Sequence, residues 1–180
     1  MNRCKWCNLN NPKYIDYHDN EWGVAVHDDN KLFEMLLLES FQAGLSWECV
    51  LNKREAFRKA FDNFNPYLIS EYDNKKQDEL LKDKDIIRSR RKIEASINNA
   101  KIFLEIKEEY GSFDSYIWHF TGGEVIKNID DEFKVTSELS DTVSNDLKKR
   151  GMKYTGSITI YSYLQAIGVI DDHEMSCYKY

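Results

Sequence analysis

Four residues with the chemistry of metal ligands lie in two pairs at the ends of the sequence. Cys4 and His18 lie near the beginning, and His173 and Cys177 lie near the end. Two thiolates and two imidazoles are a typical donor set for a tetrahedral Zn²⁺. Because the protein would fill all four coordination positions, we expect one structural Zn²⁺ per chain, which would hold the two ends of the chain together.

A nearby cysteine permits a second interpretation of the N-terminal segment. Cys4 and Cys7 form a Cys-x-x-Cys pair, a spacing that also occurs in zinc half-sites and in redox dithiols. No βαβ pattern typical of thioredoxins surrounds this pair, which argues against the redox reading. Taken singly, each cysteine or histidine is also compatible with an ordinary core thiol or surface imidazole.

Three of the four tryptophans, Trp6, Trp22 and Trp47, lie within the first 47 residues, together with Tyr14 and Tyr17. Flat rings in such a group are typical of a pocket that stacks a planar ligand. Plain packing in the hydrophobic core is the alternative for each of them. The sequence therefore indicates a stacking pocket without excluding a core cluster.

Glu39 is an acidic residue in an apolar pattern. On a helix it shares a stripe with Leu32, Met35, Leu36 and Ala43. A carboxylate on an apolar face is unfavourable unless it is hydrogen-bonded or paired. Two interpretations remain open at this point: a structural ion pair with an arginine, or a buried acceptor that receives N–H groups from a ligand.

Two basic runs have the composition of phosphate contacts. Residues 83–92, Asp-Lys-Asp-Ile-Ile-Arg-Ser-Arg-Arg-Lys, lie between two helical patterns. Backbone amides in a tight turn and at a helix N-terminus can bind phosphate. Lys148, Lys149, Arg150 and Lys153 form the second run. A solvated helix face would explain either run equally well.

The elements that must position these residues read as helices. The sequence has only two prolines, and residues 30–43 are apolar on most faces, which predicts a buried helix. Ser46 is a suitable N-cap for the next helix, and residues 93–104 have apolar positions at helical spacing. A basic last turn followed by Gly151 predicts another helix end. Only residues 158–163 alternate like a strand, and local propensity does not decide between helix and strand there.

Composition places the chain among soluble globular proteins. It has 180 residues, which suffices for a single domain over 1–180, with 42% hydrophobic and 31% charged residues. We expect no signal peptide and no membrane span, and the sparse cysteines favour a reducing, cytoplasmic setting. The net charge of −6 argues mildly against bulk nucleic-acid binding, but a local basic face remains compatible with it.

Together these features resemble the bacterial 3-methyladenine DNA glycosylase I family, and the resemblance extends over essentially the whole chain. The motifs that carry it include Tyr-x-x-Tyr-His-Asp-x-x-Trp-Gly (14–23), Leu-Phe-Glu-Met-x-x-Leu-Glu (32–39), Gln-Ala-Gly-Leu-Ser-Trp (42–47), Ile-Ile-Arg-x-Arg-x-Lys-Ile (86–93), Leu-Lys-Lys-Arg-Gly-x-Lys-Tyr-x-Gly (147–156) and Tyr-Ser-Tyr-Leu-Gln-Ala-x-Gly…Asp-His-x-x-x-Cys (161–177).

The resemblance implies an all-α helix–hairpin–helix glycosylase fold, with the helix–hairpin–helix element at about residues 76–105 and a helix over 158–163. It assigns the structural zinc to Cys4, His18, His173 and Cys177, in end segments 4–18 and 173–177. It further implies a catalytic role for Glu39, base binding by Trp6, Tyr14, Tyr17, Trp22, Glu39 and Trp47, and DNA binding by Gln42, Leu45, Arg88, Arg90 and Arg91.

The implied activity is removal of a damaged base from DNA. The partner would be double-stranded DNA containing alkylated purines, the product free 3-methyladenine, and the enzyme a monomer. No equivalent of a catalytic aspartate or lysine after the hairpin is evident, so the enzyme would be monofunctional. The alternatives are a non-catalytic helix–hairpin–helix protein that binds DNA damage, a zinc-dependent hydrolase and a zinc-stapled interaction domain. Cys7 and Asp85 depart from the family pattern.

Overall fold

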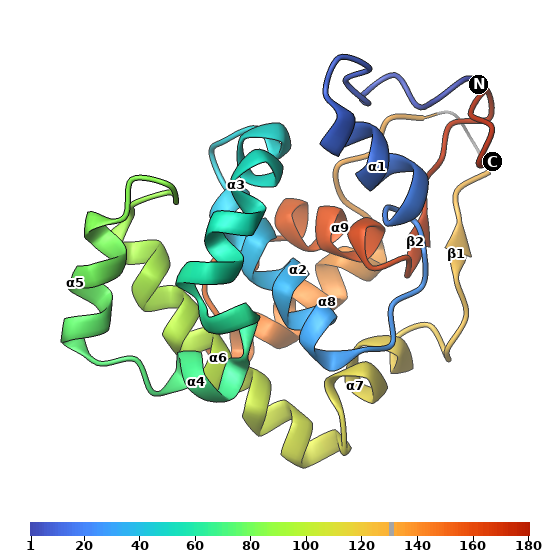
Figure 1. Cartoon of the computed structure of the whole chain (residues 1–180). Coiled ribbons are helices and arrows are strands. Elements are labelled where there is room, and N and C mark those ends of the chain that lie inside the picture. Colours follow the sequence, from blue (N-terminus) through green and yellow to red (C-terminus); the bar gives the residue numbers. More distant parts are fainter. Residues whose placement is uncertain (130–131) are drawn as a thin grey trace.

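The computed structural model describes residues 1–129 and 132–180, and this part of the chain is mostly helical (Figure 1). The predicted helical class is confirmed at this level. The one exception among the described residues is a short pair of strands. The elements are α1 (Pro12–Asn20), α2 (Asp29–Gln42), α3 (Trp47–Ala60), η1 (Asp62–Phe64), α4 (Pro66–Ser70), α5 (Asn74–Lys82), α6 (Arg90–Tyr110), α7 (Phe113–His119), β1 (Ile126–Lys127), α8 (Glu138–Lys149), α9 (Ser157–Ala166) and β2 (Ile170–Asp171).

Short polar side chains begin most of these helices. Asn11, Asp28 and Ser46 each accept a hydrogen bond from a backbone N–H in the first turn of α1, α2 and α3. These bonds satisfy amides that have no partner inside the helix. The N-cap predicted at Ser46 is therefore confirmed, with the hydroxyl accepting from the amide of Cys49 at 3.2 Å.

Helix α2 is the central element of the core. Ten consecutive residues, 32–41, are buried, because α3, α6, α7 and α9 all pack around this helix. This confirms the buried helix predicted for residues 30–43. Glu39 therefore lies inside the protein although its own side chain carries an ionisable group.

Residues 158–163 form part of helix α9, as the family resemblance implied and the alternating pattern did not. In the helix, Ile160, Tyr163 and Leu164 are fully buried, while Ile158 is 61% exposed. Packing against α2 and α8 stabilises the helix in spite of its β-branched residues. Tertiary burial thus outweighs local propensity in this segment.

Helices α5 and α6 are joined by the loop 83–89, which lies in the segment predicted to form the hairpin. The loop is anchored by buried Ile86 and by a hydrogen bond from the amide of Asp85 to the Asp83 carboxylate at 2.8 Å. Positive φ outside glycine occurs, within the described part of the chain, only at Asp62, Asn63, Phe64 and Tyr154. The departure at Asp85 therefore requires no left-handed backbone.

The two ends of the chain lie side by side (Figure 1). The amide of Tyr178 donates to the carbonyl of Asn2 at 2.9 Å, and the Asn2 side chain donates to the carbonyl of Ser176 at 2.7 Å. Strands β1 and β2 pair in parallel just before the C-terminal segment. No helix in the described residues is long and apolar enough to span a membrane.

Candidate functional site

A cavity of about 610 Å³ opens between the N-terminal segment, α2, α3 and α9. All six residues predicted to bind a base line this cavity: Trp6, Tyr14, Tyr17, Trp22, Glu39 and Trp47. They come from three different parts of the chain, and the packing of α3 against both α1 and α2 brings them together. The aromatic residues singled out in the first 47 positions therefore surround one cavity.

The rings form a continuous wall. Trp6 lies 4.7 Å from Trp22 between ring centroids, with an interplanar angle of 66°, and 5.5 Å from Tyr14. Tyr17 lies 5.1 Å from Trp47. Trp6, Tyr14 and Trp47 are only partly buried, whereas Tyr17 and Trp22 are buried. Core packing covers most of Tyr17 and Trp22, although both line the cavity, and the other three rings are less covered.

Glu39 is the acidic group of this wall, and it is 3% exposed. The described residues provide it with no hydrogen bond or ion pair. Arg54, a buried arginine, is bound instead to Glu21 at 2.8 Å and to Glu34 at 2.7 Å. Burial alone raises the pKa of the Glu39 carboxyl to about 8. The ion-pair interpretation of Glu39 is therefore wrong, and the residue is a buried acceptor beside a cavity.

The raised pKa of Glu39 has a measurable consequence for stability. Between pH 4.5 and pH 8 the folded protein keeps the proton that the unfolded chain releases. The free energy of unfolding therefore falls as the pH rises through this window and levels off above it. The glutamine of Glu39→Gln cannot ionise. We therefore expect the free energy of unfolding of this variant to exceed that of the wild type by about 2–4 kcal/mol between pH 5 and pH 8. Urea unfolding at several pH values measures this difference, and parallel stability curves would contradict it.

A second wall of the cavity escaped the sequence reasoning. It consists of Ile158, Tyr161, Ser162 and Gln165 from α9, together with Asp172 after β2. The four α9 positions follow the i, i+3, i+4, i+7 spacing of one helix face. This signal was present in the sequence, but the alternating pattern of residues 158–163 concealed it. The segment 132–135 also lines the cavity.

The residues predicted to contact DNA lie at two places near the surface, the C-terminus of α2 with the loop after it, and the N-terminus of α6 with the loop before it. Gln42 lines the cavity and donates from Nε2 to the carbonyl of Leu45 at 3.0 Å, and Leu45 is 40% exposed. Arg88, Arg90 and Arg91 are exposed at the loop before α6, where Arg90 pairs with Asp78 at 3.1 Å. The structure thus leaves both groups on the surface, but it does not bring the arginines into the cavity.

Two cations in the basic runs have structural partners instead. Lys92 donates from Nζ to the carbonyls of Phe41 and Ala43, at 2.6 and 2.7 Å, and so stabilises the C-terminus of α2. Arg150 pairs with Glu109 at 2.6 Å and with Asp146 at 2.7 Å. These two side chains of the basic runs therefore stabilise the fold.

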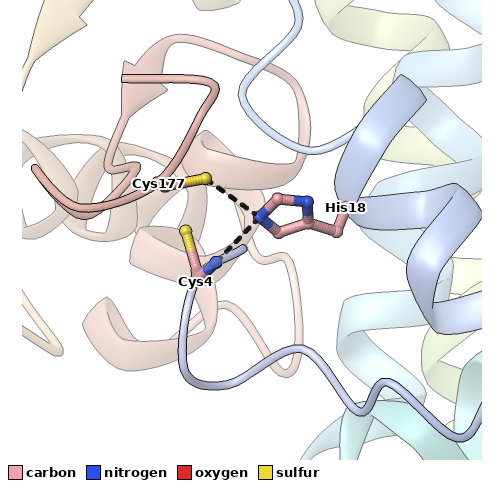
Figure 2. A group of neighbouring side chains, drawn as sticks. All are labelled: Cys4, His18 and Cys177. Atoms are coloured by element: carbon pink, nitrogen blue, oxygen red, sulfur yellow. Dashed lines mark hydrogen bonds between the residues drawn. The ribbon is translucent and has the colours of Figure 1, made fainter. Parts of the chain in front are cut away.

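A cluster of buried metal-ligand residues joins the two ends of the chain (Figure 2). Cys4, His18 and Cys177 each bring one ligand atom within 4.8 Å of the others. The Nε2 atom of His18 faces both cysteines, at 3.2 Å from the Cys4 amide and 3.5 Å from the Cys177 sulfur (Figure 2). Burial raises the pKa of the Cys4 thiol to about 12. A cation bound there would therefore have to offset the free energy needed to deprotonate this thiol.

His173, the fourth predicted ligand, lies beside this cluster with its ring centroid 5.4 Å from that of His18. Its Nδ1 is 2.6 Å from Asp171, while its Nε2 is buried without a hydrogen-bond partner in the described structure. The Nδ1 of His18 is likewise 2.8 Å from Asp19. Carboxylates on the far nitrogen are typical of metal-binding histidines. The orphaned Nε2 and this donor set therefore fit a tetrahedral zinc ion.

Cys7 does not belong to the three-residue cluster, although it is buried. Its thiol donates instead to the carbonyl of Tyr14 at 3.7 Å. Within the described residues, all four cysteines are free thiols. The geometry therefore favours Cys4 over Cys7 as a ligand.

Gly23 permits the close approach of His173 to the turn that follows α1. It has φ +74°, and a Cβ atom there would lie 2.7 Å from the His173 ring. We expect Gly23→Ala to displace the imidazole, lower the metal content and reduce the free energy of unfolding by about 1–3 kcal/mol. Gly111→Ala is the matched control, because Gly111 has φ +83° but nothing within 4 Å. Equal metal content in both variants, measured by metal analysis, would refute this role.

Comparison with known protein families identifies the class of protein to which this fold and aromatic cavity belong. The family model for methyladenine glycosylase matches residues 6–180, so the chain belongs to this family. The family predicted from the sequence motifs is thereby confirmed.

Individual relatives match over almost the whole chain. DNA-3-methyladenine glycosylase 1 of Escherichia coli (strain K12) is 40% identical, and the match covers 100% of this chain and 97% of the relative. A crystal structure of 3-methyladenine DNA glycosylase I superposes with a TM-score of 0.94 at 41% identity, covering 98% of both chains. The enzyme of the same name from Staphylococcus aureus, solved to explain its recognition of 3-methyladenine, gives a TM-score of 0.93 at 35% identity, covering 99% of this chain and 96% of the other.

Proposed function

We propose that the protein is a monofunctional DNA glycosylase that hydrolyses the N-glycosidic bond of 3-methyladenine in alkylated double-stranded DNA. The observation that carries the proposal is the unpaired Glu39 carboxyl, buried among the rings of a cavity. The names of the relatives, DNA-3-methyladenine glycosylase, agree with this activity. A non-catalytic DNA-damage-binding protein, the main alternative, would need only surface contacts with phosphate and no buried carboxyl.

The chemistry follows from the charge of the damaged base. Such a base must leave the helical stack before an enzyme can reach it, at a cost of a few kcal/mol. A 3-methylated adenine carries positive charge, so its bond to the sugar is already weak. Aromatic faces attract cations, and an ionised Glu39 would accept hydrogen bonds from the edge of the base. Binding the cation would also favour the ionised form of Glu39, whose pKa is raised in the free protein.

The aromatic residues would have different roles in binding the base. Trp47 and Trp6 would stack on the everted base, since both are only partly buried. Tyr14 and Tyr17 would contact its polar edge, and Trp22 would form the wall behind it. Normal adenine lacks the positive charge, so this pocket would bind it less well. Hydrolysis would then release free 3-methyladenine.

The exposed loops would hold the DNA. In this proposal α5, the loop 83–89 and α6 form a helix–hairpin–helix element, whose backbone amides bind phosphate. Arg88, Arg90 and Arg91 would add charge to this contact. Gln42 and Leu45, at the edge of the cavity, would fill the gap left by the everted base. Residues 1–180 would act as one domain and as a monomer.

Zinc would have a structural role. Cys4, His18, His173 and Cys177 would hold one Zn²⁺, which supplies a closed tetrahedral link between the ends of the chain. The two ends already meet through the backbone hydrogen bond between Asn2 and Tyr178. Since all four ligand positions come from the protein, no coordination site would remain for a substrate.

The direct test is to incubate the purified protein with methylated duplex DNA and to identify the bases set free. We expect release of 3-methyladenine, with abasic sites and no strand cleavage. Binding to methylated DNA without release of any base would instead support the non-catalytic alternative. Cleaved strands in the absence of alkali would refute the monofunctional assignment.

A further inference from the structure

A hydrogen-bonded polar group lies in the second wall of the cavity, apart from Glu39 and the aromatic rings. Its centre is the carboxylate of Asp172. Oδ2 accepts from Nε2 of Gln165 at 2.5 Å and from the hydroxyl of Tyr161 at 3.1 Å, and Oδ1 accepts from Nδ2 of Asn128 at 2.5 Å. Asp172, Gln165 and Tyr161 all line the cavity. The function proposed above assigns no role to any of them.

This arrangement determines which end of the Gln165 amide is left to bind something else. An ionised carboxylate only accepts hydrogen bonds, so the NH₂ group of Gln165 must point toward Asp172. The amide oxygen Oε1 is then the group that remains as an acceptor. The backbone of the residue is held as well, because its carbonyl accepts from the amides of Gly23 at 3.0 Å and Gly168 at 3.2 Å. Gly23 follows Trp22, and both Trp22 and Gln165 line the cavity.

Hydrolysis needs a group of this kind. As the C1′–N9 bond breaks, its electron pair passes to the base and neutralises the positive charge there, while positive charge develops on the sugar. The oxygen of a water molecule then bonds to C1′, and the proton it loses passes to bulk water. A water that donates to a fixed acceptor directs a lone pair away from that acceptor. The cavity of about 610 Å³ is larger than a single base requires, which leaves room for this water.

We propose that Gln165 is a catalytic residue that orients the attacking water through its amide oxygen, and that Asp172 is a positioning residue that fixes this amide. The inference rests on the proposed function, because it concerns the hydrolytic step of that reaction. The proposal assigns different roles to the two walls of the cavity. Glu39 and the rings bind the base, and the α9 wall directs the nucleophile.

The test compares Gln165→Met, Asp172→Asn and the double variant. We expect each single variant to slow single-turnover release of 3-methyladenine from methylated duplex DNA by about 10- to 100-fold, since a misplaced nucleophile costs about that much. The affinity for free 3-methyladenine, measured by tryptophan fluorescence, should stay at the wild-type value. If Asp172 acts through Gln165, the double variant should be no slower than Gln165→Met alone.

Asn128→Ala is the matched control. It removes the hydrogen bond to the other oxygen of Asp172 and leaves the bond to Gln165 in place, so release should continue at the wild-type rate. Metal content is measured in every variant, because Asp172 precedes His173. If Asp172→Asn loses metal, Gln165→Met decides the proposal. Wild-type release rates in Gln165→Met would overturn it, whereas a wild-type protein that releases no base would refute the proposed function instead.

Discussion

Glu39→Gln is expected to fold normally and to release 3-methyladenine from methylated DNA about 100-fold more slowly than the wild type, or slower still. The carboxyl is buried beside the rings and has no partner among the described residues, so a cationic base that binds there would favour its ionised form and pair with it. Glutamine keeps the shape and one acceptor oxygen but cannot carry the negative charge. The measurement is the single-turnover rate of base release with enzyme in excess.

The same variant separates loss of chemistry from loss of structure. Its thermal midpoint at pH 8 should equal or exceed that of the wild type, because a costly buried charge has been removed. Glu55→Gln is the control, since Glu55 is exposed on α3 and pairs only with Arg58 among the described side chains. Release at the wild-type rate by Glu39→Gln would remove this residue from the site.

Cys177→Ser should cause the largest loss of stability. A cysteine that binds zinc contributes the free energy of metal binding to folding, so losing it removes several kcal/mol. For a chain of this size we expect the thermal midpoint to fall by about 10 °C. Metal analysis of the purified protein should show less than one zinc per chain, and a chelator should lower the midpoint of the wild type but not that of the variant.

Two other cysteines serve as controls for this experiment. Cys49 is partly exposed and lies outside the cluster of Cys4, His18 and Cys177. Cys49→Ser should therefore keep both zinc and the chelator response. Cys7→Ser tests the Cys-x-x-Cys alternative, and we expect it to keep its zinc as well. Stoichiometric zinc in Cys177→Ser would show that the ends are joined without this ligand.

Much of the candidate site could be predicted from the sequence, because its residues are unusual for their local context. Glu39 interrupts an apolar stripe, three of the four tryptophans lie in the first 47 residues, and possible metal ligands occur near both ends. Hydrophobic periodicity and N-cap residues such as Ser46 also predicted α2 and α3. These are local properties, and they depend on neighbours within a few residues.

Segment 158–163 shows where local information was insufficient. Its alternating β-branched residues favour a strand, yet the contacts of α9 with α2 and α8 make it a helix. Only in the helix do Ile158 and Ser162 share a face with Gln165, because a strand would place residues an odd number of positions apart on opposite faces. Reading this segment as a strand conceals the whole second wall of the site.

What the sequence by itself determined is therefore which residues are chemically capable of acting: four candidate metal ligands, the rings and one buried acid. Only the tertiary structure decided how they are paired. Arg54 binds Glu21 and Glu34 and so leaves Glu39 alone, while Asp172 binds Gln165. The physical reason is that pairing energies depend on distances between side chains that meet only after packing, and these distances are not encoded in spacing along the chain.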